Sequence, residues 1–148
     1  MNIRKMIKED IDKGLFNAYK EGYIYHLNGR PDIFQKLSED EYIKDFNETI
    51  KNNEIIVICD NDNVFGYLAY KISSNKIKKL WIEQLCILKE HQNKGYAKKL
   101  LNEANIIAAR DNCKRIELSC WDFNDKALSL YENLGFNKQR IIFELPLN

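Results

Sequence analysis

Two short segments of the sequence combine residue types whose spacing could do chemistry, and the first begins at Gln92. The run Gln92-Asn93-Lys94-Gly95-Tyr96-Ala97 follows the apolar residues Leu85-Cys86-Ile87-Leu88 and opens a helical pattern. The first N–H groups of a helix have no partner within it, and the aligned peptide dipoles place partial positive charge there. Gly95 would let the backbone approach a ligand closely, and Lys94 adds a positive charge. The segment therefore predicts a phosphate site, against the alternative of an ordinary turn before a helix.

Two common phosphate motifs are absent from the sequence. No segment reads GxxxxGK[ST], which excludes a P-loop, and no GxGxxG follows an apolar strand pattern, which excludes the dinucleotide fingerprint. A different phosphate-bearing ligand is therefore expected.

The second segment, residues 124–136, is typical of a short helix with well-defined ends. Asn124 is a natural N-cap, Asp125 stands in the first turn, and Gly135 suits the position after the last turn. Tyr131 lies on the apolar face of this predicted helix, so packing alone would also explain it.

Taken together, the two segments resemble the GNAT superfamily of acyl-CoA-dependent N-acyltransferases. Residues 92–97 match its Q/R-x-x-G-x-G/A turn, with alanine at the last position, and the later N-x-x-A-x-x-x-Y-x-x-x-G-F signature is matched by Asn124, Ala127, Tyr131, Gly135 and Phe136. The resemblance covers about residues 54–143. It implies acetyl-CoA as acyl donor, and residues 92–97 as the cradle of its pyrophosphate. It also implies direct attack by an amine in a ternary complex.

The resemblance assigns further residues to the coenzyme and to proton transfer. Asn124 would also bond the coenzyme near the pantetheine, and the backbone of Leu85, Cys86 and Ile87 would pair with the pantetheine arm and stabilise the oxyanion. Tyr131 would protonate the leaving thiolate, because a phenol of pKa about 10 can protonate a thiolate whose acid has a pKa of about 8.5.

The base that deprotonates the amine is left open by the sequence. Glu83 is the first candidate, because strand alternation would place Trp81, Glu83, Leu85 and Ile87 on one face, where apolar neighbours would desolvate the carboxylate. A glutamate at the rim, paired with a lysine, is the alternative interpretation. Glu117, Asp122 or a water chain could serve instead.

The amine acceptor is expected in the aromatic region near the first helix. Aromatic faces attract an ammonium group, and the candidates are Tyr23, Tyr25, His26, Phe34 and Trp81. Tyr19 belongs to the same region, but its spacing favours a role in the core. The sequence does not identify the acceptor or the preferred acyl chain.

Composition restricts the class of protein and its partners. The 148 residues contain 23 Lys+Arg and 22 Asp+Glu, a formal charge of +1, so no overall field favours nucleic acid or a membrane surface. Four cysteines form no CxxC pair, and two histidines complete no zinc-binding spacing, so no metal is expected. Residues 1–10 carry charges rather than an apolar leader pattern, and no run is long enough to span a bilayer. A cytoplasmic enzyme is predicted.

Periodicity predicts one α/β domain over residues 1–148, in the order βααβββαβαβ. The predicted strands are residues 3–7, 55–59, 64–72, 77–88, 115–121 and 140–145. The first helix should start near Asp10, residues 22–37 should form a loop with helical fragments, and Ser38 with Glu41 should cap the second helix. The resemblance implies the GNAT fold, a mixed and mostly antiparallel sheet whose fourth and fifth strands splay apart to admit coenzyme A.

The sequence leaves two alternatives to an N-acetyltransferase of small amines, amino acids or peptides. One is a non-catalytic acyl-CoA sensor, which would be expected to lack the proton donor, although Tyr131 is present. The other is a protein-interaction domain without cofactor, against which the intact 92–97 turn and Asn124 argue. The final strand, with Ile141, Phe143 and Leu145, could offer an exposed edge for a homodimer.

Overall fold

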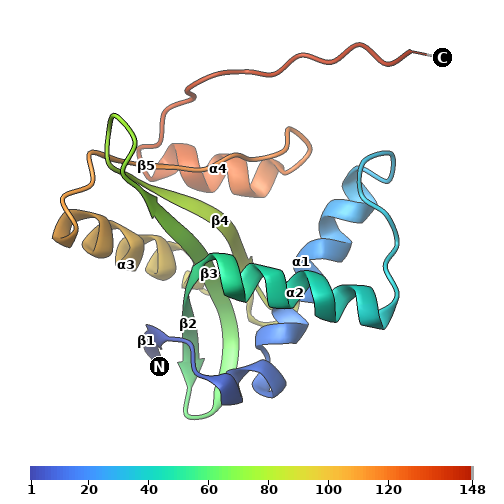
Figure 1. Ribbon diagram of the computed structural model, residues 1–148, viewed down its shortest axis with the longest axis vertical. Coiled ribbons are helices and arrows are strands. Elements are labelled where there is room, and N and C mark those ends of the chain that lie inside the picture. The colour runs from blue at the N-terminus through green and yellow to red at the C-terminus, as the bar shows by residue number, and fades with distance from the viewer. Residues whose placement is uncertain (148) are drawn as a thin grey trace. The chain divides into compact units, whose positions relative to one another are not determined.

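The computed structural model describes residues 1–147, which fall into two compact units, residues 1–118 and 119–147. The first unit is built on a five-stranded sheet (Figure 1). Its strands are β1 (Asn2–Lys5), β2 (Glu54–Asp60), β3 (Asn63–Ser73), β4 (Lys79–Ile87) and β5 (Arg115–Glu117). They lie in the sheet in chain order, and every neighbouring pair is antiparallel except β4 and β5, which are parallel. The mixed, mostly antiparallel α/β architecture expected from the sequence is confirmed.

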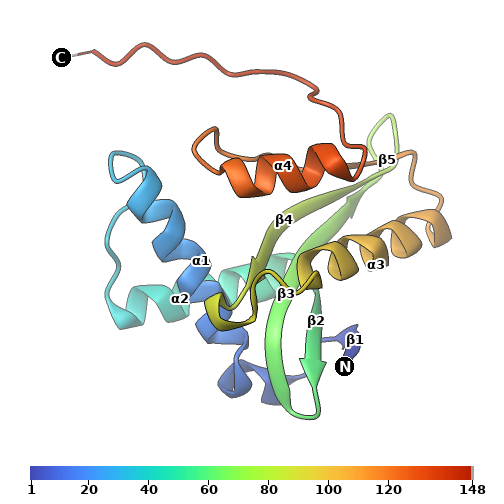
Figure 2. The same cartoon turned by 180° about the vertical axis from the view of Figure 1, so that it is seen from behind.

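Helices cover both faces of this sheet, as the two opposite views show (Figures 1 and 2). The helices α1 (Leu15–Gly29) and α2 (Glu39–Asn52) pack on one face, where β2 and β3 contribute buried residues such as Val57 and Tyr67. The helix α3 (Tyr96–Arg110) covers the opposite face and buries one apolar stripe. That stripe consists of Leu100, Leu101, Ala104, Ile107 and Ala108. Alternating side chains of the central strands therefore fill two separate layers.

The cap of α2 is the one that the sequence predicts. The Ser38 hydroxyl accepts a hydrogen bond from the Glu41 N–H at 3.2 Å, and the Glu41 carboxylate accepts one from the Ser38 N–H at 3.1 Å. The exchange satisfies two backbone donors that the helix itself leaves unpaired.

The beginning and the length of α1 differ from the sequence prediction. Residues Lys8–Lys13 form a 3₁₀ turn, α1 begins only at Leu15, and it continues to Gly29 through a region expected to be a loop. Gly14 separates the two helical segments with φ of +127°, and a Cβ there would lie 2.3 Å from the carbonyl oxygen of Val64. Only glycine tolerates both that backbone conformation and that approach, so the helix cannot run through from Asp10.

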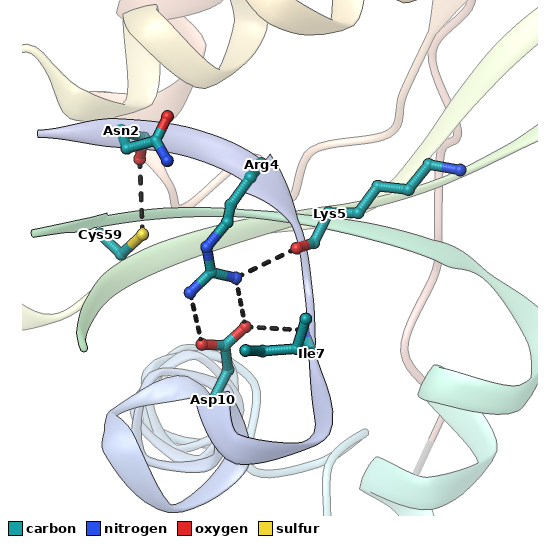
Figure 3. Close-up of polar contacts among 6 residues, drawn as sticks. All are labelled: Asn2, Arg4, Lys5, Ile7, Asp10 and Cys59. Atoms are coloured by element: carbon teal, nitrogen blue, oxygen red, sulfur yellow. Dashed lines mark hydrogen bonds and ion pairs between the residues drawn. The ribbon is translucent and has the colours of Figure 1, made fainter. Parts of the chain in front are cut away.

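A buried ion pair fixes the 3₁₀ turn to β1 (Figure 3). The Arg4 guanidinium donates two hydrogen bonds to the Asp10 carboxylate, at 2.8 and 2.9 Å, and the Ile7 N–H donates a third at 2.8 Å. Asp10 is 1% exposed. Burial alone would raise the pKa of Asp10, but these hydrogen bonds and the Arg4 charge outweigh it and hold the pKa below its usual value.

The second unit contains the helix α4 (Asp125–Asn133), followed by an extended segment. Two predicted strands extend into this unit and are wrong. The predicted strand of residues 115–121 stops at Glu117, in the first unit, and residues 140–145 form no strand. A strand needs a neighbour for its backbone groups, and among residues 119–147 no second strand offers one. None of the helices in residues 1–147 is long and apolar enough to cross a membrane.

Candidate active site

The predicted phosphate turn lies where β4 leads into α3. A short 3₁₀ turn, Lys89–His91, is followed by two residues with left-handed backbone, Asn93 at φ +64° and Gly95 at φ +80°. Helix α3 begins at Tyr96, and no side chain caps its N-terminus. Apart from the adjoining backbone, a Cβ on Gly95 would meet no atom of residues 1–147 within 4 Å, so the space above the turn is open. The turn can thus offer backbone N–H groups, the dipole of a 15-residue helix and the Lys94 charge to an anion.

Contacts from three other elements hold this turn in place. The Gln92 side-chain amide donates to the Ile87 carbonyl at 3.0 Å, and the Glu21 carboxylate on α1 accepts from the Lys89 N–H at 2.7 Å. The Leu88 N–H donates to the Phe65 carbonyl on β3 at 2.8 Å. The Phe65 ring also lies against the rings of His91 and Tyr96, with centroid separations of 4.2 and 5.6 Å. The turn is therefore fixed before any ligand binds.

A β-bulge at Glu83 changes which side chains of β4 share a face. Ile82 pairs with Tyr70 and Gln84 pairs with Ala69, so Glu83 is the extra residue on β4. Beyond the bulge, Leu85 pairs with Leu68. The predicted common face of Trp81, Glu83, Leu85 and Ile87 is wrong, because an extra residue reverses the alternation that the prediction assumed.

The bulge gathers polar side chains on the face that α1 and α2 cover. Trp81 pairs with Lys71, on the same face of β3 as the core residue Ala69. The Trp81 indole N–H donates to the Glu83 carboxylate at 2.8 Å, and the Lys71 ammonium lies 4.0 Å from the same oxygen. Gln84, opposite Ala69, joins this face. Lys71 is the lysine partner that the alternative interpretation of Glu83 expected. The Glu83 side chain is 42% exposed, so it also has access to water.

The outer edge of β4 is open along most of its length. Strand β5 pairs with β4 only from Lys79 to Trp81, and no strand of residues 1–118 pairs with that edge from Ile82 to Ile87. At an open strand edge, alternate residues direct their backbone N–H and C=O groups away from the sheet. Leu85, Cys86 and Ile87, the predicted partners of the pantetheine, all lie in this stretch.

The Cys86 thiol is the contact point between β4 and α1. A Cβ on Gly22 of α1 would lie 2.5 Å from its sulfur, so only glycine permits this approach. Burial raises the pKa of Cys86 to about 11, although a hydrogen bond with the Tyr67 hydroxyl acts in the other direction. Tyr67, which is 1% exposed, donates its hydroxyl to the side-chain carbonyl oxygen of Gln84 at 2.6 Å. This contact was not foreseen from the sequence, because it depends on cross-strand register.

Four of the five predicted acceptor residues lie on α1 and the segment that follows it. The Tyr23 and His26 rings contact the Phe34 ring, with centroid separations of 5.8 and 5.6 Å. The Tyr23 hydroxyl donates to the Gln35 carbonyl at 2.8 Å, and Tyr25 is 48% exposed. Trp81, the fifth, lies on β4. Tyr19 is a core residue as expected, 2% exposed, with its hydroxyl bonded to Asp45.

The two fallback bases differ in their surroundings. The Glu117 carboxylate lies 2.8 Å from the Lys79 ammonium and 3.7 Å from the Arg115 guanidinium, and its side chain is 14% exposed. Both of its carboxylate oxygens therefore lie within 4.0 Å of a cation. Asp122 is exposed in the second unit.

The second unit carries the two remaining predicted residues. Asn124 caps α4 as expected, its side-chain oxygen accepting from the Ala127 N–H at 3.3 Å. The backbone carbonyl of Tyr131 accepts from the Phe136 N–H at 3.0 Å, and the two rings lie 5.6 Å apart. Gly135, at φ +93°, provides the left-handed turn that brings Phe136 back onto the helix.

Sequence reasoning missed a hollow of about 910 Å³ between α1, α2 and the 3₁₀ turn after β4. It is lined by Asn17, Lys20, Glu21, Ile24, Glu39, Tyr42, Leu88, Lys89 and Glu90. Glu21 and Ile24 lie close to Tyr23 in the sequence, but only the packing of α1 on β4 reveals the cavity. Among residues 1–147, no group of three or more His, Cys, Asp or Glu residues is arranged to hold a metal ion.

Comparison with known proteins identifies a family and several relatives of this chain. The model of the acetyltransferase (GNAT) family matches residues 15–136. The probable spermine N(1)-acetyltransferase of Bacillus subtilis subsp. natto is 34% identical over 74 residues, 49% of each chain. N-alpha-acetyltransferase 30 of Schizosaccharomyces pombe is 30% identical over 94 residues, 62% of this chain and 63% of that one. The chain spans about half the length of the first curated relatives that it matches.

Solved structures share the fold along the whole chain. A mutant form of the BH1408 protein from Bacillus halodurans has a TM-score of 0.89 at 22% identity, covering 100% of both chains. Aminoglycoside N-acetyltransferase AAC(6')-Iy, crystallised with CoA, has a TM-score of 0.72 at 17% identity, covering 98% of this chain and 93% of that one.

Proposed function

The chain belongs to the acetyltransferase (GNAT) family, and from this premise we propose that it transfers an acetyl group from acetyl-CoA to the primary amine of a small molecule, an amino acid or a peptide. The family uses acetyl-CoA as acyl donor. The amine attacks the thioester carbon directly in a ternary complex, and the C–S bond breaks as the new C–N bond is completed. We also propose that both units act as one acetyltransferase domain, since the family match extends over both of them.

This proposal rests on one observation. The open edge of β4 leads, through the 3₁₀ turn Lys89–His91, to the uncapped start of α3. An open strand edge can pair with the amide-bearing pantetheine arm, and a helix N-terminus can hold the pyrophosphate that follows it. Residues Gln92, Asn93, Lys94, Gly95, Tyr96 and Ala97 would form the pyrophosphate cradle. An unpaired N–H near Cys86 or Ile87 would stabilise the tetrahedral oxyanion.

Two proton transfers complete the reaction. Tyr131 would give its phenolic proton to the departing thiolate of coenzyme A, and Asn124 would bond the coenzyme while capping α4. Glu83 would accept the amine proton, either directly or through water, because its side chain is part-exposed on the face of β4 that carries Trp81. Release of Glu83 from Lys71 on binding of the amine would remove the neighbouring ammonium group from this carboxylate.

The acceptor proposed is a cationic amine. The relatives' names include spermine/spermidine N(1)-acetyltransferase and thialysine N-epsilon-acetyltransferase, and each names an amine-bearing acceptor. In this chain, the rings of Tyr23, His26 and Phe34 lie together, and Tyr25 and Trp81 add further aromatic surface. Aromatic faces of this kind attract an ammonium group before it deprotonates. We place the enzyme in the cytoplasm, consistent with four unpaired cysteines among its described residues.

The decisive experiment measures thiol release from acetyl-CoA with polyamines, amino acids, aminoglycosides and short peptides. The wild type is compared with Tyr131→Phe, and Tyr70→Phe serves as the matched control, since it removes the hydroxyl of a buried tyrosine on β3. Turnover with one acceptor class, reduced on the order of 10²-fold or more only in Tyr131→Phe, would support both the reaction and its acid. Coenzyme A binding without turnover of any acceptor would favour the sensor function instead.

A second variant tests the cradle separately from the chemistry. A side chain at Gly95 would occupy the open space above the turn and strain a left-handed backbone. Gly95→Val should therefore raise the KM for acetyl-CoA more than it lowers kcat. An unchanged KM would argue against pyrophosphate binding at this turn.

A further inference from the structure

The carboxylate of Glu83 is held at only one of its two oxygens. The Trp81 indole N–H donates a hydrogen bond of 2.8 Å to Oε2. The Lys71 ammonium lies 4.0 Å from the same oxygen. Oε1 has no hydrogen bond or ion pair with any of residues 1–118. One oxygen of this carboxylate is therefore restrained, and the other is available to a ligand.

The two contacts at Oε2 differ in strength. The indole hydrogen bond has an ordinary length and an ionised acceptor, and such bonds are about twice as strong as those between neutral groups. The Lys71 and Glu83 side chains are 52% and 42% exposed, so water and salt screen their ion pair. Trp81 is therefore the main restraint on the orientation of the Glu83 carboxylate.

The sheet fixes the backbone of Trp81 more firmly than that of Glu83. Trp81 pairs with Lys71 on β3 and with Glu117 on β5, and it is the last residue of β4 that has a neighbouring strand on both sides. Glu83, two residues later, is the extra residue of the bulge and has no partner residue on β3. A bulge leaves its extra residue outside the regular ladder, so backbone pairing does not orient the Glu83 side chain. A contact from the fixed Trp81 ring can do so.

We propose that Trp81 is a positioning residue for acetyl transfer, whose indole N–H holds Oε2 of Glu83 and leaves Oε1 to accept the proton of the attacking amine. This inference rests on the proposed function, in which Glu83 is the base. As the amine nitrogen forms the new C–N bond it loses a proton, which Oε1 takes up directly or through one water. A base that is already oriented does not have to be ordered during the reaction, so loss of the restraint lowers kcat. The predicted role of Trp81 as an aromatic wall for the acceptor depends on its ring face instead.

Two replacements of Trp81 separate its N–H from its aromatic face. Trp81→Phe keeps an aromatic ring without a donor, whereas Trp81→His keeps a five-membered ring whose Nε2–H can take the place of the indole N–H. The assay is kcat for thiol release from acetyl-CoA at pH 8, at saturating concentration of the most active polyamine, amino acid, aminoglycoside or short peptide. Trp81→Phe should lower kcat about tenfold and Trp81→His should lower it less, with the KM for acetyl-CoA unchanged in both. A larger loss in Trp81→His than in Trp81→Phe would overturn the proposal, because the ring rather than its donor would then matter.

A double-variant cycle tests whether Trp81 acts through Glu83. Glu83→Ala alone should lower kcat on the order of 10²-fold or more, and adding Trp81→Phe should cause no further loss. Tyr70→Phe is the control, since Tyr70 pairs with Ile82 on β4, and it should keep the wild-type kcat. A further tenfold loss in the double variant, or a wild-type kcat in Trp81→Phe beside a slow Glu83→Ala, would overturn this inference alone. A wild-type kcat in Glu83→Ala would remove the proposed base, and no turnover with any amine would remove the reaction, and the inference would fail with either.

Discussion

Replacing Arg4 by methionine should destabilise the protein by leaving the buried Asp10 carboxylate without its partner. The wild-type carboxylate accepts two hydrogen bonds from Arg4 and one from the Ile7 N–H, and its side chain is 2% exposed. Removing one partner of a buried ion pair typically costs about 3–5 kcal/mol. The Arg4 side chain is 29% exposed and reaches water, so we expect the lower end, about 3 kcal/mol.

The assay is urea unfolding followed by far-UV circular dichroism at pH 7. With an m-value of about 2 kcal/mol per molar, a loss of about 3 kcal/mol lowers the unfolding midpoint by about 1.5 M. The control is Lys13→Met, since the Lys13–Asp62 pair has side chains 43% and 81% exposed, and its loss should cost less than about 1 kcal/mol. The double variant Arg4→Met/Asp10→Leu should regain most of the lost stability, because it leaves no buried charge.

The pH dependence provides an independent check on the cause. In the wild type, the lowered pKa of Asp10 contributes stability above the unfolded pKa of about 3.9, and this is lost as pH falls through the folded pKa. Without Arg4, burial raises the folded pKa above the unfolded one, so protonation relieves the cost as pH falls. The difference in unfolding free energy between wild type and Arg4→Met should therefore shrink from pH 7 to pH 4. A constant difference, or a double variant as unstable as Arg4→Met, would refute the reasoning.

Three further predictions concern the contact between α1 and β4 and its cysteine. Gly22→Ala should lower the unfolding free energy by about 1–3 kcal/mol, because its Cβ would lie 2.5 Å from the Cys86 sulfur, and Gly22→Ala/Cys86→Ala should recover part of that loss in the same urea assay. Cys86 should resist alkylation by iodoacetamide at pH 8 in the folded protein, because desolvation raises its pKa to about 11 and keeps the thiol protonated there. Rapid loss of this thiol, followed by mass spectrometry of peptides, would contradict the raised pKa. Tyr67→Phe, beside Cys86 on the neighbouring strand, should lower the unfolding free energy by about 1 kcal/mol in the same urea assay, because the Gln84 side-chain oxygen would lose its hydrogen bond from the buried hydroxyl; an unchanged unfolding midpoint would contradict this role.

Local sequence signals were sufficient for much of the fold. The capping box of Ser38 and Glu41, the N-cap of Asn124 and the left-handed Gly135 each depend on residues within a few positions, so the sequence alone could predict them. Runs of apolar residues likewise located the central strands. The family and its general fold followed from two motifs whose spacing is preserved in the chain.

The features that the sequence did not determine depend on partners distant in the chain. Gly14 ends the 3₁₀ turn because Val64 lies against it, and the bulge at Glu83 appears only in the register of β4 on β3. Residues 140–145 have the alternating sequence of a strand, but the structure forms no strand there. Composition and periodicity determine which segments can bury an apolar face, whereas register, close approach and strand pairing are decided by what the tertiary structure places opposite each segment.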